Sequence, residues 1–329
     1  MRVAVFSAKP YDKVYLTQFN QDLDLDLQFF DNGLNNQTVV LAEGFNAVCV
    51  FVNDVLDDTV LTDLSKRGIT HVALRCAGFN NVNLAKAKEL NISVSRVPAY
   101  SPQAVAEHAV ALILTLNRKL HKAYNRVREN NFSLHGLLGF NLYGKTVGVI
   151  GTGNIGEAFV NIMLGFGCQV KCYDPLPKQQ LIERGAEYVS LDELFKQGQI
   201  ISLHCPLNAS STHLINSQSI ELMQDGVMLI NTSRGGLIDS KAVIHALKKG
   251  KIGYLGLDVY EMESDLFFED HSATIIQDDV FERLASFPNV LITGHQGFFT
   301  HEAMQQIAET TLGNLQAVQQ NRQIEARFL

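Results

Sequence analysis

Short apolar runs rich in β-branched residues recur along the whole chain, and stretches with helical spacing separate most of them. Such runs, without alternating polar positions, predict strands that are buried on both faces, which is typical of a parallel sheet. In the first hundred residues these runs are RVAVFS, AVCVFV, HVALRCA and ISVSRV. This part of the chain is therefore predicted to be α/β.

The pattern changes at residue 101, where SPQAVAEHAVALILTLNRKLHKAYNRV begins. Ser101 is predicted as the N-cap of a helix and Pro102 as its first residue, because serine accepts the free N–H groups and proline needs no N–H there. Apolar residues follow on nearly every face of this helix. We therefore expect it to be buried all round.

A second series of apolar runs follows, consisting of TVGVIG, QVKCYD, IISLHCP, GVMLINTS, YLGLDVY and NVLITGH. Helical stretches such as SIELMQ and SKAVIHALKKG separate most of them. Repeated βα units predict an open, doubly wound parallel sheet. Because no low-complexity linker is present, the change of series near residue 100 is the predicted domain boundary.

Composition and charge narrow the class of protein. The chain has 329 residues, 46% of them hydrophobic and 19% charged, which predicts a folded protein of two domains or one large α/β unit. Its net charge is −7 and it has no basic run, so we expect no nucleic-acid partner. Its apolar runs are too short for a signal peptide or for the roughly 18 to 20 residues of a membrane span. We therefore expect a soluble cytoplasmic protein, with no membrane partner and five buried free cysteines.

The segment GTGNIG has the context of a dinucleotide-binding turn. Gly151, Gly153 and Gly156 follow the apolar run TVGVI and open the helical stretch EAFVNIMLGFG. Such glycines allow a tight turn and close approach of a pyrophosphate, and the helix N-terminus offers free N–H groups to it. Asp174, eighteen residues after Gly156, ends the next strand. A carboxylate there accepts hydrogen bonds from ribose hydroxyls and repels a 2′-phosphate, so NAD is predicted in preference to NADP.

Two other patterns that would imply different chemistry fail on their context. GFNLYGKT, residues 139–146, matches the phosphate-loop pattern, but its lysine and threonine lead into a predicted strand instead of a helix. Glu107 and His108 are neighbours and would point about 100° apart on a helix, so they cannot ligate a metal from one face. No metal site is predicted.

Polar residues follow the late predicted strands, where the reacting groups of open α/β sheets lie. They are Arg234, Asp258, Glu261, Glu263 and His295. An arginine binds a carboxylate and polarises a carbonyl, a histidine exchanges a proton, and a carboxylate stabilises the imidazolium. This set suits hydride transfer to a 2-keto acid. His301 falls where the next helix begins and is expected to face solvent.

Each of these residues also has a structural alternative when it is taken singly. Arg234 could form a structural ion pair, Glu263 could be surface charge, and His295 could be a core residue with satisfied hydrogen bonds. Their occurrence together, beside a dinucleotide-binding turn, favours a catalytic site over the three separate alternatives.

The chain resembles the D-isomer-specific 2-hydroxyacid dehydrogenases over essentially its full length. The motifs that carry the resemblance are VGVIGTGNIG, ISLHCPLNASSTHLIN, LINTSRGGLIDSKAV, LDVYE, ITGHQGFFT, LRCAGFNNV and VPAYSPQAVAEHA. Within that family it is most similar to the fermentative, NAD-dependent D-lactate dehydrogenases. The resemblance implies reversible reduction of pyruvate to D-lactate with NADH.

The resemblance also implies individual roles. Arg234 would bind the substrate carboxylate and carbonyl, His295 would be the acid/base, and Glu263 would be its partner, whereas Glu261 matches a position that the family does not use in this way. The implied cofactor contacts are Gly151, Gly153, Ile155, Gly156, Asp174, Pro206, Thr232 and Asp258. On the substrate side, the implied residues are the backbone N–H groups of Ala77 and Gly78, the pocket side chains of Tyr100, Phe298 and Phe299, and Phe51 as a limit on substrate length.

The family architecture implies that the chain forms two doubly wound parallel-sheet domains. A Rossmann dinucleotide-binding domain, residues 101–297, would be inserted in a flavodoxin-like substrate domain, residues 1–100 and 298–329. A homodimer or homotetramer is also implied. Two alternatives remain open, namely a dehydrogenase for another 2-keto acid and an NADH-sensing, corepressor-like binding protein of the same fold.

Overall fold

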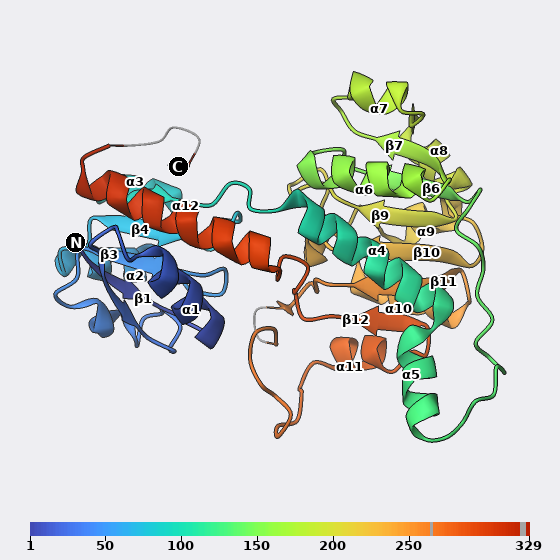
Figure 1. Ribbon diagram of the computed structural model, residues 1–329, viewed down its shortest axis with the longest axis horizontal. Coiled ribbons are helices and arrows are strands. Elements are labelled where there is room, and N and C mark those ends of the chain that lie inside the picture. The colour runs from blue at the N-terminus through green and yellow to red at the C-terminus, as the bar shows by residue number, and fades with distance from the viewer. Residues whose placement is uncertain (264–265, 323–326) are drawn as a thin grey trace. The chain divides into compact units, whose positions relative to one another are not determined.

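The computed structural model describes residues 1–263, 266–322 and 327–329, and its contacts divide the chain into two compact units (Figure 1). Unit 1 comprises Met1–Ser101 and Phe299–Leu329, and unit 2 comprises Pro102–Phe298. Each unit contains a parallel sheet with helices on its faces. The predicted α/β class with two doubly wound parallel sheets is confirmed.

The sheet of unit 1 has the strand order β2-β1-β3-β4-β5, which is that of flavodoxin-like folds. Its strands are β1 (Arg2–Val5), β2 (Asp26–Phe29), β3 (Ala47–Val50), β4 (His71–Leu74) and β5 (Ser93–Ser95). The apolar runs predicted as strands form β1, β3, β4 and β5. Strand β2 was not predicted because it pairs at the edge of the sheet, where DLQF alternates exposed and half-buried side chains.

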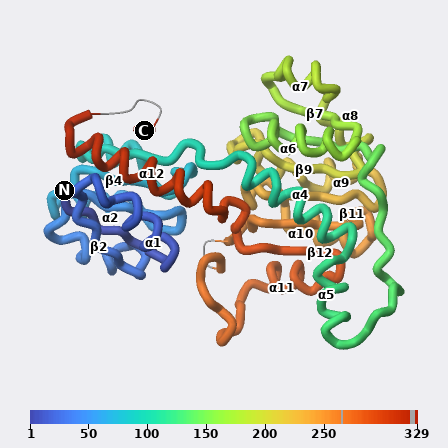
Figure 2. Tube along the Cα trace, in the orientation of Figure 1, coloured from blue at the N-terminus to red at the C-terminus, as the bar shows by residue number. Residues whose placement is uncertain are grey.

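Helices cover both faces of this sheet. They are α1 (Pro10–Phe19), the 3₁₀ turn η1 (Val39–Ala42), α2 (Asp58–Lys66), α3 (Leu84–Glu89) and α12 (His301–Gln319). Helix α12, from the end of the chain, packs on α1 and on β4 (Figure 2). Its Leu312 and Leu315 bury against Val3 and Val5 of β1, so the last helix completes the core of the first hundred residues.

The sheet of unit 2 has the order β12-β11-β10-β9-β6-β7-β8, the usual order of dinucleotide-binding folds with one strand added. Its strands are β6 (Thr146–Ile150), β7 (Gln169–Tyr173), β8 (Glu187–Tyr188), β9 (Ile200–Leu203), β10 (Val227–Asn231), β11 (Ile252–Leu257) and β12 (Val290–Ile292). The strand order reverses between β6 and β9. Ligands of open α/β sheets bind at the carboxyl ends of the strands at such a point.

Helices α4 and α6 cover one face of this sheet, and α8, α9 and α10 cover the other. The helices are α4 (Pro102–Arg118), α5 (Leu120–Arg128), α6 (Asn154–Gly165), α7 (Gln179–Glu183), α8 (Leu191–Gln197), α9 (Ser217–Leu222), α10 (Ser240–Lys248) and α11 (Asp279–Ala285), with the 3₁₀ turn η2 (Gly235–Leu237). In the described parts of the chain, no helix is long and apolar enough to cross a membrane.

The helix predicted after residue 101 is present as α4, but the expectation that it is buried all round was wrong. The helix α4 ends at Arg118, because Lys119 adopts a left-handed backbone with φ of 51° and a new helix, α5, starts behind it. Helix α4 also exposes Glu107 and Ala111, while α5 has no buried residue. Only the face of α4 that meets the sheet and α6 is covered.

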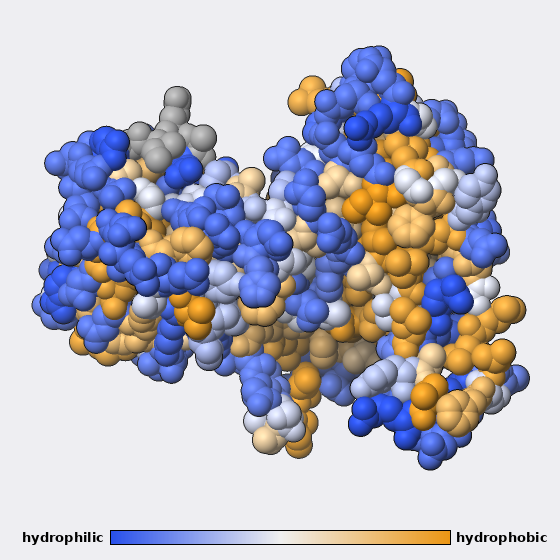
Figure 3. Space-filling model, viewed as in Figure 1, coloured by the Kyte–Doolittle hydropathy of each residue, from blue (hydrophilic) through white to orange (hydrophobic). Residues whose placement is uncertain are grey.

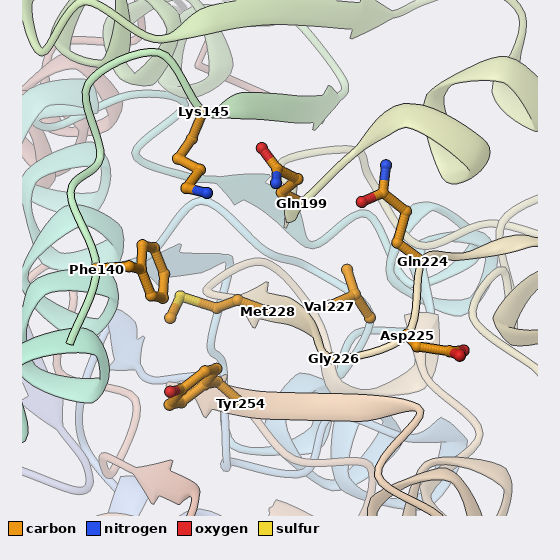
Figure 4. A pocket seen from close by; sticks show the side chains of 9 residues that line it. All are labelled: Phe140, Lys145, Gln199, Gln224, Asp225, Gly226, Val227, Met228 and Tyr254. Carbon is orange, nitrogen blue, oxygen red and sulfur yellow. The ribbon is translucent and has the colours of Figure 1, made fainter. Parts of the chain in front are cut away.

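The rejection of a phosphate loop at residues 139–146 is confirmed. Thr146 is the first residue of strand β6, so no helix N-terminus follows the lysine. The ammonium group of Lys145 lies 5.7 Å from the ring centre of Phe140. Both side chains line a cavity of about 220 Å³ together with Gln199 and Gln224 (Figure 4). Lys145, Gln199 and Gln224 each lie shortly before a strand of the sheet.

His71 on β4 is a buried, neutral histidine that makes folding stability depend on pH. Its Nδ1 lies 2.8 Å from Ser93 Oγ and its Nε2 lies 2.9 Å from Ser95 Oγ. Burial lowers the pKa of His71 to about 4, against an ordinary value of 6.5. The unfolded chain therefore takes up a proton below pH 6.5 while the folded chain does not. The contribution of the neutral His71 to the free energy of unfolding is therefore fully present above pH 6.5 and is lost as the pH falls towards 4.

We expect His71 to account for a loss of about 2 kcal/mol of unfolding free energy between pH 7 and pH 5. The variant His71→Gln, measured by urea unfolding at both pH values, should lose correspondingly less over that interval. The matched variant His135→Gln, at an exposed position, should retain the wild-type dependence. An equal pH dependence in wild type and His71→Gln would contradict this assignment.

Candidate functional site

The glycine turn after β6 has the shape that a bound pyrophosphate requires. Gly151 has φ of 92°, and a Cβ atom there would lie 2.6 Å from the backbone nitrogen of Cys205. A Cβ atom at Gly156 would overlap the carbonyl oxygen of Gly151, whereas the space beside Gly153 is open. Helix α6 starts directly after Gly153, which provides no side-chain cap. The N–H groups of its first turn are therefore available to an anion, and this turn fits a dinucleotide.

Asp174 lies at the end of β7, next to the glycine turn. Its Oδ2 accepts a hydrogen bond of 2.7 Å from the backbone N–H of Thr152, and its Oδ1 accepts one of 2.8 Å from Leu176. The side chain is half-buried. Two amides thus orient the carboxylate beside the turn, where it can meet the hydroxyls of an adenosine ribose.

The other predicted cofactor residues lie after neighbouring strands. Thr232, directly after β10, is buried, and its hydroxyl has no hydrogen-bond partner among the described residues. A buried hydroxyl without a protein partner fits a group that binds a cofactor. Ile155 is half-buried in the first turn of α6, and Pro206 is exposed after β9.

The expectation that all five cysteines are buried was wrong for Cys205. This residue, which lies beside the glycine turn, is only half-buried.

Asp258, predicted as a cofactor contact, directs both carboxylate oxygens at the protein. Oδ1 accepts hydrogen bonds from Thr293 Oγ1 at 2.5 Å and from the N–H of Gln296 at 2.9 Å, while Oδ2 accepts one from the N–H of Gly297 at 2.8 Å. Burial opposes its ionisation, but hydrogen bonds from His108 and Thr293 outweigh burial and lower the pKa of Asp258. The carboxylate therefore orders the loop that follows β12.

His108 on α4 completes this arrangement and was not predicted as part of the site. Its Nε2 lies 3.2 Å from Asp258 Oδ1 and 3.0 Å from Thr293 Oγ1. In the sequence, His108 was assessed only as a possible metal ligand together with its neighbour Glu107. The side chain of Glu107 is exposed. In the parts of the chain that are described, no cluster of three or more metal-ligating side chains occurs.

His295 and Glu263 form a close pair. His295 Nδ1 lies 3.0 Å from Glu263 Oε1, and the two side chains are 19% and 22% exposed. The other oxygen of Glu263 accepts a hydrogen bond of 2.9 Å from the backbone N–H of Tyr260. Because an ionised carboxylate only accepts, Nδ1 of the imidazole carries the proton. Nε2 is then left to exchange a proton with another molecule.

The backbone of His295 is held in the left-handed region, with φ of 52°. Its N–H donates to the carbonyl oxygens of Asp258 at 2.8 Å and Thr293 at 3.1 Å. The ring of Phe268 lies against the imidazole, with ring centres 5.7 Å apart. This backbone region is uncommon for residues other than glycine, and it persists here because the loop is fixed at several points.

Arg234 follows β10, the neighbour of β11 in the sheet. Its Nη1 donates to the carbonyl oxygen of Ser233 at 2.8 Å, and the carbonyl oxygen of Arg234 accepts a hydrogen bond of 2.8 Å from Asn231 Nδ2. The side chain is half-buried, and among residues 1–263, 266–322 and 327–329 no carboxylate lies within ion-pair distance of it. A half-buried guanidinium in this state is suited to binding an external carboxylate.

Glu261 contacts different partners from those of Glu263. Its Oε1 lies 2.6 Å from His213 Nε2, and its Oε2 accepts a hydrogen bond of 3.0 Å from Ser240 Oγ. These contacts connect the loop after β11 with the loop after β9 and the start of α10. Glu261 therefore braces the loop that carries Glu263.

In unit 1, the loop after β4 presents two backbone amides. The carbonyl oxygen of Ala77 accepts a hydrogen bond of 3.0 Å from Arg96 Nη1, and that of Gly78 accepts one of 3.3 Å from Cys76 Sγ. Within the described parts of the chain, no group accepts a hydrogen bond from the N–H of either residue. These amides are therefore available to a ligand.

The predicted pocket side chains are divided between the units. Phe51, Tyr100 and Phe299 belong to unit 1, where Phe299 is half-exposed and packs edge-on against Tyr11 at 4.8 Å. Phe298 is the last residue of unit 2 and is buried. His301 is exposed at the start of α12, as expected, and its Nδ1 forms a hydrogen bond with Tyr15.

The strand order of unit 2, its glycine turn and its acidic residue after β7 are those of a dinucleotide-binding domain. Together with the His295–Glu263 pair, which is suited to proton exchange, they indicate a dinucleotide-dependent oxidoreductase. Residues 110–297 match the family model described as "D-isomer specific 2-hydroxyacid dehydrogenase, NAD binding domain". The chain is 56% identical over 315 residues to D-lactate dehydrogenase of Escherichia coli, with 96% of each chain covered.

Solved structures agree with the sequence comparison. The apo-structure of D-lactate dehydrogenase from Escherichia coli superposes with a TM-score of 0.92 and 51% identity, covering 99% of each chain. A pyruvate reductase of Chlamydomonas reinhardtii superposes with a TM-score of 0.94 and 46% identity, covering 98% of this chain and 97% of the other. The chain belongs to the D-isomer-specific 2-hydroxyacid dehydrogenases. The resemblance predicted from the sequence, the enzyme class and the NAD cofactor are thereby confirmed.

Proposed function

We propose that this enzyme catalyses the reversible reduction of pyruvate to D-lactate with NADH. The observation that carries the proposal is the His295–Glu263 pair at 3.0 Å, after β12 and β11. The guanidinium of Arg234 adds to it, because it follows the adjacent β10 and no carboxylate of the described residues pairs with it. Relatives named D-lactate dehydrogenase and pyruvate reductase support this choice of substrate within the family.

Arg234 binds the substrate. Its guanidinium pairs with the carboxylate of pyruvate and polarises the neighbouring carbonyl group, which charge-assisted hydrogen bonds do more strongly than neutral ones. In unit 1, the backbone N–H groups of Ala77 and Gly78 also donate to the carboxylate. Tyr100, Phe298 and Phe299 provide apolar contacts, and Phe51 limits the length of the substrate.

His295 acts as the general acid/base. In the direction of reduction, Nε2 of the imidazolium donates a proton to the carbonyl oxygen, and bound NADH supplies the hydride that the carbonyl carbon receives. Glu263 holds Nδ1–H and stabilises the positively charged ring before the transfer. In the reverse direction, the neutral imidazole takes the proton from the hydroxyl of D-lactate.

We also propose the functional division of the chain. Residues 101–297 form the dinucleotide-binding domain, in which Gly151, Gly153, Ile155, Gly156, Asp174, Pro206, Thr232 and Asp258 hold NAD. Three observations support this assignment. The first turn of α6 has no side-chain cap, the hydroxyl of Thr232 has no hydrogen-bond partner among the described residues, and the space beside Gly153 is open. Residues 1–100 and 298–329 form the substrate domain.

The proposal is tested by following NADH oxidation with pyruvate and resolving the lactate enantiomers. D-lactate as the product, with a higher kcat/KM for pyruvate than for branched or aromatic 2-keto acids, is the expected result. L-lactate, or a preference for the bulkier acids, would overturn the proposed reaction.

Replacing Asp174 by alanine should weaken the selection of NADH over NADPH. Removal of a carboxylate that accepts ribose hydrogen bonds and repels a 2′-phosphate should raise the NADPH/NADH ratio of kcat/KM about tenfold or more. Steady-state kinetics with both cofactors measures this ratio. The variant Asp192→Ala, at an exposed position on α8, serves as the matched control and should leave the ratio unchanged. An unchanged ratio in Asp174→Ala would contradict the assignment.

We propose further that the enzyme is a homodimer or homotetramer of the cytoplasm. Helix α5 and the segment behind it expose many large apolar side chains, with Phe132, Leu134 and Leu138 between 71% and 86% exposed. Hydrophobic residues are visible over this part of the surface (Figure 3). A second copy of the chain would cover them. Light scattering that gave the mass of one chain would contradict the oligomer.

The proposed cytoplasmic location is consistent with the cysteines, because the free state of all five fits a reducing compartment.

A further inference from the structure

A buried carboxylate lies beside Phe51 at the carboxyl end of β3. Asp54 is 1% exposed, and its Oδ2 accepts a hydrogen bond of 2.6 Å from the backbone N–H of Phe51. Its Oδ1 accepts hydrogen bonds from the N–H of Leu34 at 2.6 Å and from Ser7 Oγ at 2.7 Å. Burial raises the pKa of Asp54, and the charge of Arg75 and these hydrogen bonds oppose the rise. All three neighbours donate, so Asp54 serves as an acceptor.

A buried guanidinium lies against the ring of Phe51. Arg75, directly after β4, is 2% exposed, and its Cζ lies 5.1 Å from the centre of the Phe51 ring. Its Nη2 donates to the carbonyl oxygen of Ser7 at 2.7 Å, and its Nε lies 3.3 Å from Asp12 Oδ1. These contacts fix the guanidinium, so one face of the aromatic ring has a rigid neighbour.

Asn81 holds the remaining polar group of Phe51. Its Nδ2 donates to the carbonyl oxygen of Phe51 at 3.0 Å and to that of Asp54 at 2.8 Å. Asn81 belongs to the same loop as Ala77 and Gly78, which present the free amides. The turn that carries Phe51 is therefore tied directly to the loop that offers those amides.

We infer that Asp54, Arg75 and Asn81 are positioning residues that fix Phe51 and thereby set the length of the 2-keto acid that the enzyme accepts. The N–H, the carbonyl oxygen and the ring of Phe51 are each held by a different one of these residues. A pocket distinguishes substrates that differ by one methylene about tenfold or more. A small displacement of the Phe51 ring is enough to remove that discrimination. The inference rests on the proposed function, in which Phe51 limits substrate length.

The test compares kcat/KM for pyruvate with kcat/KM for 2-oxobutanoate and 2-oxohexanoate. The variant Asn81→Ala should reduce the preference for pyruvate about fivefold to tenfold, because the turn that carries Phe51 loses the two hydrogen bonds from Asn81 Nδ2. The matched control is Asn83→Ala in the same loop, whose side chain caps α3 and does not contact Phe51. This control should retain the wild-type ratio even if it is less stable.

A second background separates positioning from general damage. In Phe51→Leu the ring is absent, so adding Asn81→Ala should change the substrate ratio less than twofold. Asp54→Asn provides a further variant, since its amide would place N–H groups against the N–H of Phe51 or of Leu34. It should shift the ratio in the same direction as Asn81→Ala, and again only when Phe51 is present.

Failure of this inference differs from failure of the proposed function. An unchanged ratio in Asn81→Ala, or an equal shift with and without the Phe51 ring, would overturn the positioning role while pyruvate reduction persists. An unchanged ratio in Phe51→Leu would overturn it as well. Absence of NADH oxidation by the wild-type enzyme with every 2-keto acid would instead refute the proposed function.

Discussion

Replacing His295 by glutamine is expected to lower kcat for pyruvate reduction about a thousandfold, while the dissociation constant for NADH stays nearly unchanged. Glutamine retains polarity and approximate size but cannot exchange a proton at Nε2. Because the glycine turn and Asp174 lie after other strands, they keep their geometry. Steady-state kinetics and titration of NADH fluorescence measure the two quantities separately.

The chain offers a matched control for this experiment. His301 is an exposed histidine at the start of α12, and its ring contacts Tyr15. His301→Gln should retain wild-type turnover. Turnover like that of the wild type in His295→Gln would show that the proton comes from elsewhere and would refute the assignment of His295 as acid/base.

Replacing Arg234 by glutamine is expected to lower kcat/KM for pyruvate about a thousandfold, through both a higher KM and a lower kcat. Charge-assisted hydrogen bonds to a carboxylate contribute about 1.5 to 3 kcal/mol each, and a guanidinium offers two of them in a fork. The same side chain polarises the carbonyl, so the transition state loses more than the bound substrate does. Inhibition by a substrate analogue such as oxamate should weaken in parallel.

A comparison with another arginine distinguishes the loss of a binding group from the loss of a surface charge. Arg184 is exposed after α7 and hydrogen-bonds Asn161. Arg184→Gln should leave both kinetic constants close to those of the wild type. If Arg234→Gln changed kcat alone, with KM for pyruvate unaltered, the proposed role in binding the carboxylate would be wrong.

The sequence predicted the sheets because the buried strands of this fold are continuous apolar runs. It missed β2, in which polar and apolar residues alternate at a sheet edge, and β8, which is only two residues long. It also predicted that residues after the late strands would meet, since parallel strands end at one edge. The distance between His295 and Glu263 agrees with that rule.

Other parts of the site have no local signature. His108 stands far from Asp258 in the sequence, and a histidine on a largely apolar helix is equally compatible with a structural role. The left-handed backbone of His295 depends on carbonyl groups of two other loop positions, not on its own residue type. Arg75 follows an apolar strand directly, which is a weak signal of a buried charge, but nothing nearby indicates that its neighbours are Asp12 and the ring of Phe51.

The two hydrogen bonds that Asp174 accepts have a consequence for engineering cofactor use in biocatalysis. The same carboxylate that favours NADH also anchors the amide of Thr152 inside the glycine turn and that of Leu176 behind it. A substitution that only removes the carboxylate would also remove these hydrogen bonds and so weaken binding of the pyrophosphate of either nucleotide. A redesign for NADPH should therefore keep a hydrogen-bond acceptor at position 174, as asparagine or serine does, and introduce the cation for the extra phosphate at a neighbouring position.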